Sequence, residues 1–109
     1  MMWIPMVVIA RDGDVWVFKG SDRAAAWMEA QDVRDGEYRL FDCTGLEYAL
    51  RADSDDSPVV VGPPMSEERH GDLVLDASER FLGAMPHSMP QGRSHPADDL
   101  CERLRPHAL

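Results

Sequence analysis

Residues 6–18 read Met6-Val7-Val8-Ile9-Ala10, then Arg11-Asp12-Gly13-Asp14, then Val15-Trp16-Val17-Phe18. The two apolar runs are rich in β-branched and aromatic residues, which favour strands. An Asp-Gly pair between such runs is typical of a β-hairpin, because glycine accepts the positive φ that tight turns require. Both runs are apolar at consecutive positions, so we expect two strands that are covered on both faces and central in a sheet.

A helix is predicted directly after this hairpin. Ser21 can cap it, and it should run through about Ala30. Ala24, Trp27 and Met28 are spaced so that they share one stripe of a helix. We therefore expect Trp27 and Met28 to be buried against the sheet.

A second hairpin is predicted next. Strands are expected at residues 38–42 and 46–51, on either side of Cys43-Thr44-Gly45. Apolar and polar residues alternate in the second of these strands, as they do in an antiparallel strand with one wet face.

The second half of the chain contains an edge strand, a helix and a tail. Pro58 to Val61 is the expected edge strand, because proline is tolerated at a strand start, and Gly62-Pro63-Pro64 should end it. Helical spacing of apolar residues predicts a helix over residues 72–83, beside the first helix. After Met85 the sequence is rich in Pro, His and Ser, which predicts a linker or mobile tail.

The sequence therefore predicts an α+β fold in one domain, residues 1–85, with the order β-β-α-β-β-(β)-α. We expect a small antiparallel sheet of four to five strands with two helices on one face. Residues 86–109 form the tail, with a short helix near residues 97–105 that has Leu100 and Leu104 on one side. That helix is expected to dock on the domain or on another molecule.

The net charge of −9 lies entirely in the predicted domain. Residues 1–85 contain 17 acidic and 8 basic residues, whereas residues 86–109 contain 3 of each. Nucleic acids and anionic lipid surfaces are bound through clustered Lys and Arg, so we expect neither nucleic acid nor a membrane as a partner. A basic protein is the favoured partner, and the alternative is that the acidity serves solubility alone.

Two features of the sequence bear on location. Cys43 and Cys101 are far apart in the chain, and the simpler interpretation is that both are reduced in the cytoplasm. The apolar N-terminal run, Met1 to Ala10, has neither a basic leader nor a cleavage site, and Pro5 interrupts it, so it predicts no signal peptide. No stretch approaches the roughly 20 apolar residues that a membrane-spanning helix needs.

No pattern of residues predicts catalysis, a metal or a cofactor. Cys43 has only acids and Arg39 nearby, which do not activate a thiol, and nucleophile-elbow and phosphate-loop motifs are absent. Asp53-x-Asp55 resembles the start of a calcium loop, but its later positions are wrong. The histidines and the second cysteine lack the spacing of paired metal ligands: His70, His87, His95, His107 and Cys101.

Carboxylates near predicted turns and strand ends are the candidate binding residues. If the two hairpins are adjacent, several of these side chains, with Asp42 among them, converge into one acidic face that could dock a basic protein. Trp3 precedes the first strand and is expected to be an exposed contact residue, because Trp is enriched at interfaces. The candidates for partner binding are Asp12, Asp14, Asp32, Asp35, Glu37, Asp53, Asp55, Asp56 and Trp3.

Part of the chain resembles a known group of proteins. The residues concerned are Asp14-Val15-Trp16-Val17-Phe18, Trp27, Glu29-Ala30, Asp32-Val33, Gly36-Glu37-Tyr38, Phe41-Asp42 and Gly45. They are similar to a pattern in short uncharacterised actinobacterial proteins, some of which lie near polymorphic toxin systems and resemble immunity proteins. The resemblance covers about residues 14–51. It implies a cytoplasmic inhibitor of a cognate toxin, with no catalytic residues to carry over.

Three functions follow as hypotheses. The first is a non-enzymatic immunity or inhibitor protein that neutralises a basic toxin through its acidic face. The second is a small enzyme or ligand-binding domain with a pocket between helices and sheet. The third is a structural subunit that forms homo-oligomers through a strand edge or the tail helix.

Overall fold

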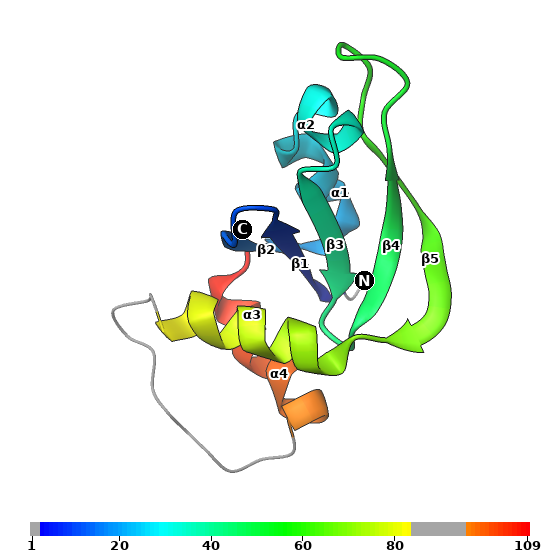
Figure 1. Ribbon diagram of the computed structural model, residues 1–109. Helices are drawn as coiled ribbons and strands as arrows, with labels where there is room; N and C mark the ends of the chain where they lie inside the picture. The colour runs from blue at the N-terminus through cyan, green and yellow to red at the C-terminus, as the bar shows by residue number, and fades with distance from the viewer. Residues whose placement is uncertain (1–2, 84–95) are drawn as a thin grey trace.

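The computed structural model describes residues 3–83 and 96–109, and it confirms the α+β class and the order of elements (Figure 1). The predicted boundary at residue 85, the Pro/His/Ser-rich linker, His87 and His95 lie outside the described residues. The elements are β1 (Pro5–Ala10), β2 (Val15–Lys19), α1 (Gly20–Trp27), α2 (Ala30–Arg34), β3 (Tyr38–Asp42), β4 (Leu46–Arg51), β5 (Val60–Arg69), α3 (Gly71–Gly83), α4 (Pro96–Leu104) and the 3₁₀ turn η1 (Arg105–His107).

Within the described residues, five antiparallel strands form one sheet in the order β2-β1-β3-β4-β5. β1 and β2 form the predicted first hairpin, and β3 and β4 form the second. Gly13 and Gly45 take φ values of +99° and +102° in the two turns, which explains why glycine stands at both positions. β1 also pairs with β3, so that Ala10 lies opposite Tyr38.

Helices cover both faces of this sheet rather than one. Val7 and Val8 are neighbours in β1 and both are fully buried, but they point into different apolar clusters. Val7 packs with residues of α3 and α4, whereas Val8 packs with Ala24 of α1. Figure 1 shows α3 and α4 on one side of the strands and α1 and α2 on the other. β1 is apolar at consecutive positions, so both of its faces must be buried by other elements. The prediction that α3 lies beside α1 on one face of the sheet is therefore wrong.

The first helix differs from the prediction at both ends. α1 begins after Lys19 without a side-chain cap and ends at Trp27, and α2 starts again at Ala30. The expected Ser21 cap and a continuous helix through Ala30 are therefore wrong. Met28 is buried as predicted, but Trp27 is 39% exposed.

The two edges of the sheet also differ from expectation. β2 is an edge strand and not a central one, and its Val17 carbonyl accepts a hydrogen bond from the Leu109 amide at 2.7 Å. β5 continues through Gly62-Pro63-Pro64 to Arg69, although these residues were expected to end the strand. Proline is tolerated because β5 is the other edge, and the β4–β5 register shifts on both sides of Tyr48 and Pro64.

Cys43 and Cys101 form a disulfide, so the prediction of two reduced cysteines is wrong. Their Cα atoms are 5.3 Å apart although the sequence separation is 58 residues. The bond joins the β3–β4 turn to α4, whose Leu100 and Leu104 are buried in the core as one face of the predicted helix. Among the residues that the structure describes, no helix combines the length and apolar character needed to cross a membrane.

Candidate functional site

Three loops that contain predicted binding residues lie at one end of the sheet. β1 and β4 end there and β2, β3 and β5 begin there, because all neighbouring strands are antiparallel. The loops are the β1–β2 turn, the α2–β3 segment and the β4–β5 loop. We call this region the acidic end, and its carboxylates are Asp12, Asp14, Asp32, Asp35, Glu37, Asp53, Asp55 and Asp56.

Trp3, the remaining candidate, lies at the opposite end of the sheet. A Cβ added to Gly20, the residue after β2, would lie 4.0 Å from the Trp3 Cβ. The Arg105 guanidinium carbon is 4.9 Å from the Trp3 ring centroid, and the Lys19 Nζ atom is 5.9 Å from it. Two cations of the chain itself therefore already occupy this ring, and Trp3 is not part of the acidic end.

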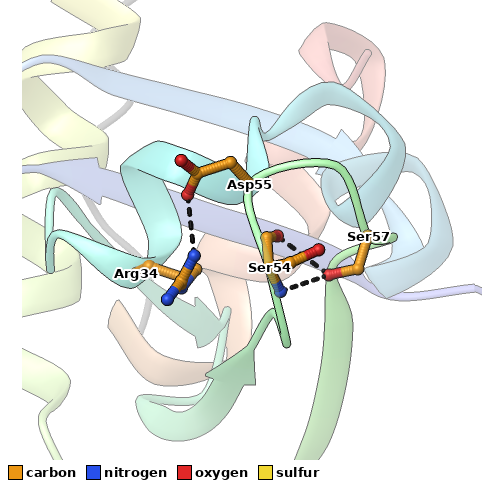
Figure 2. Close-up of polar contacts among 4 residues, drawn as sticks. All are labelled: Arg34, Ser54, Asp55 and Ser57. Carbon is orange, nitrogen blue, oxygen red and sulfur yellow. Dashed lines mark hydrogen bonds and ion pairs between the residues drawn. The ribbon is translucent and has the colours of Figure 1, made fainter.

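Three arginines neutralise part of the acidic end. The Arg11 Nη1 atom lies 3.1 Å from Glu37 Oε1, and the Arg51 Nε atom lies 3.6 Å from Asp53 Oδ1. Figure 2 shows Arg34 of α2 reaching the β4–β5 loop, where its Nη1 atom lies 2.8 Å from Asp55 Oδ1. The same loop is closed by Ser57, whose hydroxyl accepts from the Ser54 amide and donates to the Ser54 carbonyl. These pairs connect the three loops but do not balance their charge.

Five of the eight carboxylates form no ion pair within the described part of the chain. Asp12 accepts a hydrogen bond from the Asp14 amide, and Asp32 accepts one from the Tyr38 hydroxyl at 3.3 Å. The side chains of Asp14, Asp35 and Asp56 are exposed. With eight carboxylates, three ion-paired arginines and Arg80, whose Nη1 donates to the Gly13 carbonyl, the acidic end has a negative surplus that can attract a cationic partner.

A cavity of about 440 Å³ opens within the acidic end. Ala10, Trp16 and Tyr38 line it from three adjacent strands, on the face that α1 and α2 cover. Trp27 of α1 packs against two of these rings, with its centroid 4.6 Å from that of Trp16 and 5.6 Å from that of Tyr38. The polar part of the lining comes from Arg11, Asp12, Asp32 and Glu37. We call the cavity together with Trp27 the aromatic–acidic pocket.

The walls of this pocket are held by backbone hydrogen bonds. The Arg11 amide donates to the Glu37 carbonyl at 2.8 Å, and the Glu37 amide donates to the Asp32 carbonyl at 3.0 Å. The Arg11 side chain adds a bond from Nη2 to the Asp35 carbonyl at 2.6 Å. The β1–β2 turn and the α2–β3 segment are therefore fixed to each other.

Tyr38 is chemically perturbed in this setting. Burial raises the pKa of its hydroxyl above the ordinary value, and the negative charge of Asp32 and the hydrogen bond to it raise the pKa further. The phenol therefore stays neutral and donates a hydrogen bond to the Asp32 carboxylate over the physiological pH range.

The sequence did not point to the aromatic part of the pocket. Trp16 and Trp27 were expected in the core, and Tyr38 was interpreted only as the start of a strand. The available signal was positional: Trp16 and Tyr38 flank turns that are rich in carboxylates, and large side chains at strand ends line the mouth of a sheet. Using it required knowing that β1 lies between β2 and β3.

A second cavity, of about 460 Å³, lies between β2, α3 and the C-terminal residues. Arg80 at its rim is already engaged, since Nη1 donates to the Gly13 carbonyl at 3.0 Å and Nε donates to Asp76 at 3.3 Å. The cavity lies on the α3 face of the sheet and is lined by Gly13, Asp14, Val15, Trp16, Arg80, Phe81, His107 and Leu109. Its position is the one required by the ligand-binding hypothesis.

The remaining reactive groups do not gather in either cavity. Cys43 is bonded to Cys101 and offers no free thiol. The His70 ring packs edge-on against the Phe41 ring, with 5.8 Å between the ring centroids. Across residues 3–83 and 96–109, no three His, Cys, Asp or Glu side chains are grouped so that they could hold a metal ion.

No protein-family model, curated protein or solved structure matches this chain.

Proposed function

We propose that this domain is a non-enzymatic protein-binding domain whose acidic end docks a basic protein. The observation that carries the proposal is the gathering of eight carboxylates at one end of the sheet, where the described residues provide three ion-paired arginines. These loops are far apart in the chain, so the fold itself creates the charged surface. Charge of this kind speeds encounter with a basic partner and selects against acidic ones.

The same charge defines the partners that the proposal excludes. Nucleic-acid phosphates and anionic lipid headgroups are repelled by a surface with a negative surplus. A basic toxin neutralised by an immunity-type inhibitor is the specific form of the proposal. It is supported by the resemblance over residues 14–51, which includes Asp14 of the β1–β2 turn and the whole α2–β3 segment.

The disulfide bears on where the proposed inhibitor works. A cytoplasmic location was expected together with reduced cysteines, but disulfides are rare in the reducing cytoplasm. The bonded Cys43 and Cys101 favour a compartment that is oxidising, and we extend the proposal to a partner met there. Thiol trapping of the protein in its host tests this step, because free thiols at both positions would place it in the cytoplasm.

Charge-matched variants test the proposed docking surface. The first variant combines Asp14→Asn, Asp35→Asn and Asp56→Asn, three exposed side chains of the acidic end. The control combines Glu67→Gln, Glu68→Gln and Asp72→Asn, which are exposed on β5 and α3. Both variants lose the same formal charge, so a difference between them reports the position of the charge.

Lysozyme and cytochrome c, two basic proteins, serve as probes in titration calorimetry at low salt. We expect the affinity of the acidic-end variant to fall by about tenfold, while the control stays within about threefold of the parent chain. Equal losses in the two variants would mean that net charge alone attracts the probes. That outcome would remove the proposed docking surface.

The second cavity supports one alternative, a ligand-binding domain. Its volume of about 460 Å³ lies within the range of small-molecule sites, roughly 300–1,000 Å³. Phe81 supplies an aromatic wall, and Arg80 and His107 supply polar groups. Ligand-observed NMR with a set of small aromatic acids tests it, and Phe81→Ala must abolish any binding that occurs in this cavity.

A further inference from the structure

The aromatic–acidic pocket contains rings that lack the cations found on other rings of this protein. Arg105 and Lys19 lie over Trp3, and the Arg39 guanidinium carbon is 5.0 Å from the Phe41 ring centroid. In the described residues, no Lys or Arg lies over Trp16, Trp27 or Tyr38 in the same way. An electron-rich ring beside carboxylates attracts a cation, and the attraction increases when the cation is partly desolvated in a pocket.

The carboxylates of the pocket differ in whether they have a cationic partner. Glu37 is paired with Arg11, whose guanidinium is also held by the Asp35 carbonyl. Asp12 and Asp32 have hydrogen-bond donors but no cationic partner among the described residues. The pocket thus holds two unpaired carboxylates and one internal ion pair, and its net field favours a cation.

We propose that the aromatic–acidic pocket receives an arginine side chain of the basic partner. The inference rests on the proposed function and names the side chain that the acidic end recognises. A planar guanidinium can stack on an indole or phenol ring while its edge donates hydrogen bonds to carboxylates, whereas an ammonium group is compact and strongly hydrated. The combination of Trp16, Trp27 and Tyr38 with Asp12 and Asp32 therefore favours arginine over lysine.

A small residue in the lining of the pocket leaves room for that side chain. On the same face of β1, Met6 and Val8 fill the space under α1, whereas the next position on this face is Ala10. Ala10 pairs with Tyr38 and lines the cavity. A larger side chain at position 10 would occupy the space that the guanidinium needs.

The indole resonances of the three tryptophans provide a direct test. A short oligo-arginine peptide is titrated into the isotope-labelled full chain and followed by two-dimensional NMR, with an oligo-lysine peptide of equal length as the matched probe. We expect the indole N–H signals of Trp16 and Trp27 to shift. The Trp3 signal should stay in place, because this ring is at the other end of the sheet and already carries Arg105. Oligo-lysine should bind about tenfold more weakly.

Two variants separate a lost site from a lost fold. Asp32→Asn removes one unpaired carboxylate, and Ala10→Leu fills the cavity; each should weaken oligo-arginine binding by about tenfold while the backbone spectrum of α3 and α4 stays unchanged. Asp56→Asn is the control, because Asp56 belongs to the acidic end but not to the pocket. It should weaken binding by no more than about threefold.

The outcomes distinguish this inference from the proposed function. If oligo-arginine shifts the backbone amides of residues 53–56 and leaves the Trp16 and Trp27 indoles unchanged, the docking surface stands and the arginine pocket is overturned. Equal affinity for the two peptides also overturns it, because ring stacking would then contribute nothing. If neither peptide binds and the basic proteins do not bind either, both proposals fail.

Discussion

Asp42 at one end of the sheet and the aspartates of the acidic end at the other have opposite roles. At the acidic end, Asp53 and Asp55 have side chains that are 81% and 60% exposed, even though each lies near an arginine. At the other end, Asp42 is only 3% exposed. We call this other region the disulfide end; it contains the β3–β4 turn, the β5–α3 junction and Cys101.

The buried carboxylate of Asp42 is fully satisfied. Its Oδ1 atom accepts from the Thr44 amide, the Thr44 hydroxyl and the Leu46 amide, and its Oδ2 atom accepts from the Tyr48 hydroxyl at 2.9 Å. A buried charge is tolerated when it accepts several hydrogen bonds. Asp42 therefore holds the β3–β4 turn together, whereas the carboxylates of the acidic end remain available to a partner.

The largest effect is expected from removing the disulfide. The double variant Cys43→Ser with Cys101→Ser should lose about 4 kcal/mol of unfolding free energy, because the bond restricts the unfolded chain across 58 residues of sequence. Urea unfolding of the variant and of the parent chain, with and without reductant, measures the loss.

The acidic end supplies the control for this prediction. The affinity of the folded double variant for oligo-arginine should stay within about twofold of the parent value, because the pocket shares no side chain with the bond. If reduction of the disulfide lowers both the free energy of unfolding and the affinity for oligo-arginine, the two ends are coupled. The acidic end and the disulfide end would then not have separate roles. An unchanged urea midpoint would show that the bond contributes nothing to stability.

The second effect comes from the two turn glycines, one at each end. Both have positive φ, so alanine is strained at either position. A Cβ at Gly45 would also approach the backbone nitrogens of His70 and Gly71 at 3.0 Å, whereas a Cβ at Gly13 would meet only the Arg80 side chain at 3.8 Å.

We therefore expect Gly13→Ala to cost about 1 kcal/mol and Gly45→Ala about 3 kcal/mol of unfolding free energy. The difference isolates the tight packing of the disulfide end, since the backbone strain is similar in the two variants. Chemical denaturation of both variants measures it. Equal losses would mean that the β5–α3 junction moves aside at no cost.

Strands with a local signature could be predicted from the sequence. The strand at 38–42 and the strand at 46–51 agree with β3 and β4, because turn glycine and alternating polarity act over a few residues. The proline-containing stretch 62–64 was interpreted as a break, since the sequence does not reveal that β5 is an edge. The arrangement of helices on both faces depends on contacts between distant segments and was also missed.

The candidate site was predictable in its charges but not in its shape. Turn positions pointed to the carboxylates of the acidic end, because solvated acids gather in loops, but they pointed equally to Asp42, which is buried at the disulfide end. Trp3 was grouped with the carboxylates by its residue type and by its position before the first strand. The pocket rings and the Cys43–Cys101 bond depend on strand order and on the docking of α4, which no local pattern encodes.

The smallest effect concerns the two tyrosines of the chain, which report on opposite ends. Tyr38 donates to Asp32 at the acidic end, and Tyr48 donates to Asp42 near the disulfide end. Burial, the largest cause in both cases, raises the pKa of each hydroxyl above 10.0, and the aspartate raises it further. We expect the ultraviolet absorbance of tyrosinate to appear at higher pH in the folded chain than in the unfolded chain.

The sign of the linked stability follows from these raised pKa values. Above the ordinary tyrosine pKa, the unfolded chain loses phenol protons that the folded chain keeps. The free energy of unfolding therefore falls as pH rises through the folded pKa values. Below the ordinary tyrosine pKa, the full contribution of the two tyrosines to stability is present.

Asp32→Asn removes a negative charge that lies beside Tyr38 and not beside Tyr48. The pKa of Tyr38 measured by NMR titration should therefore fall, while the pKa of Tyr48 should stay unchanged. Asp35→Asn, an exposed neighbour on the same segment, should move neither. If both tyrosines follow Asp32→Asn, the electrostatics of the two ends are not independent, and the division between a binding end and a structural end does not hold.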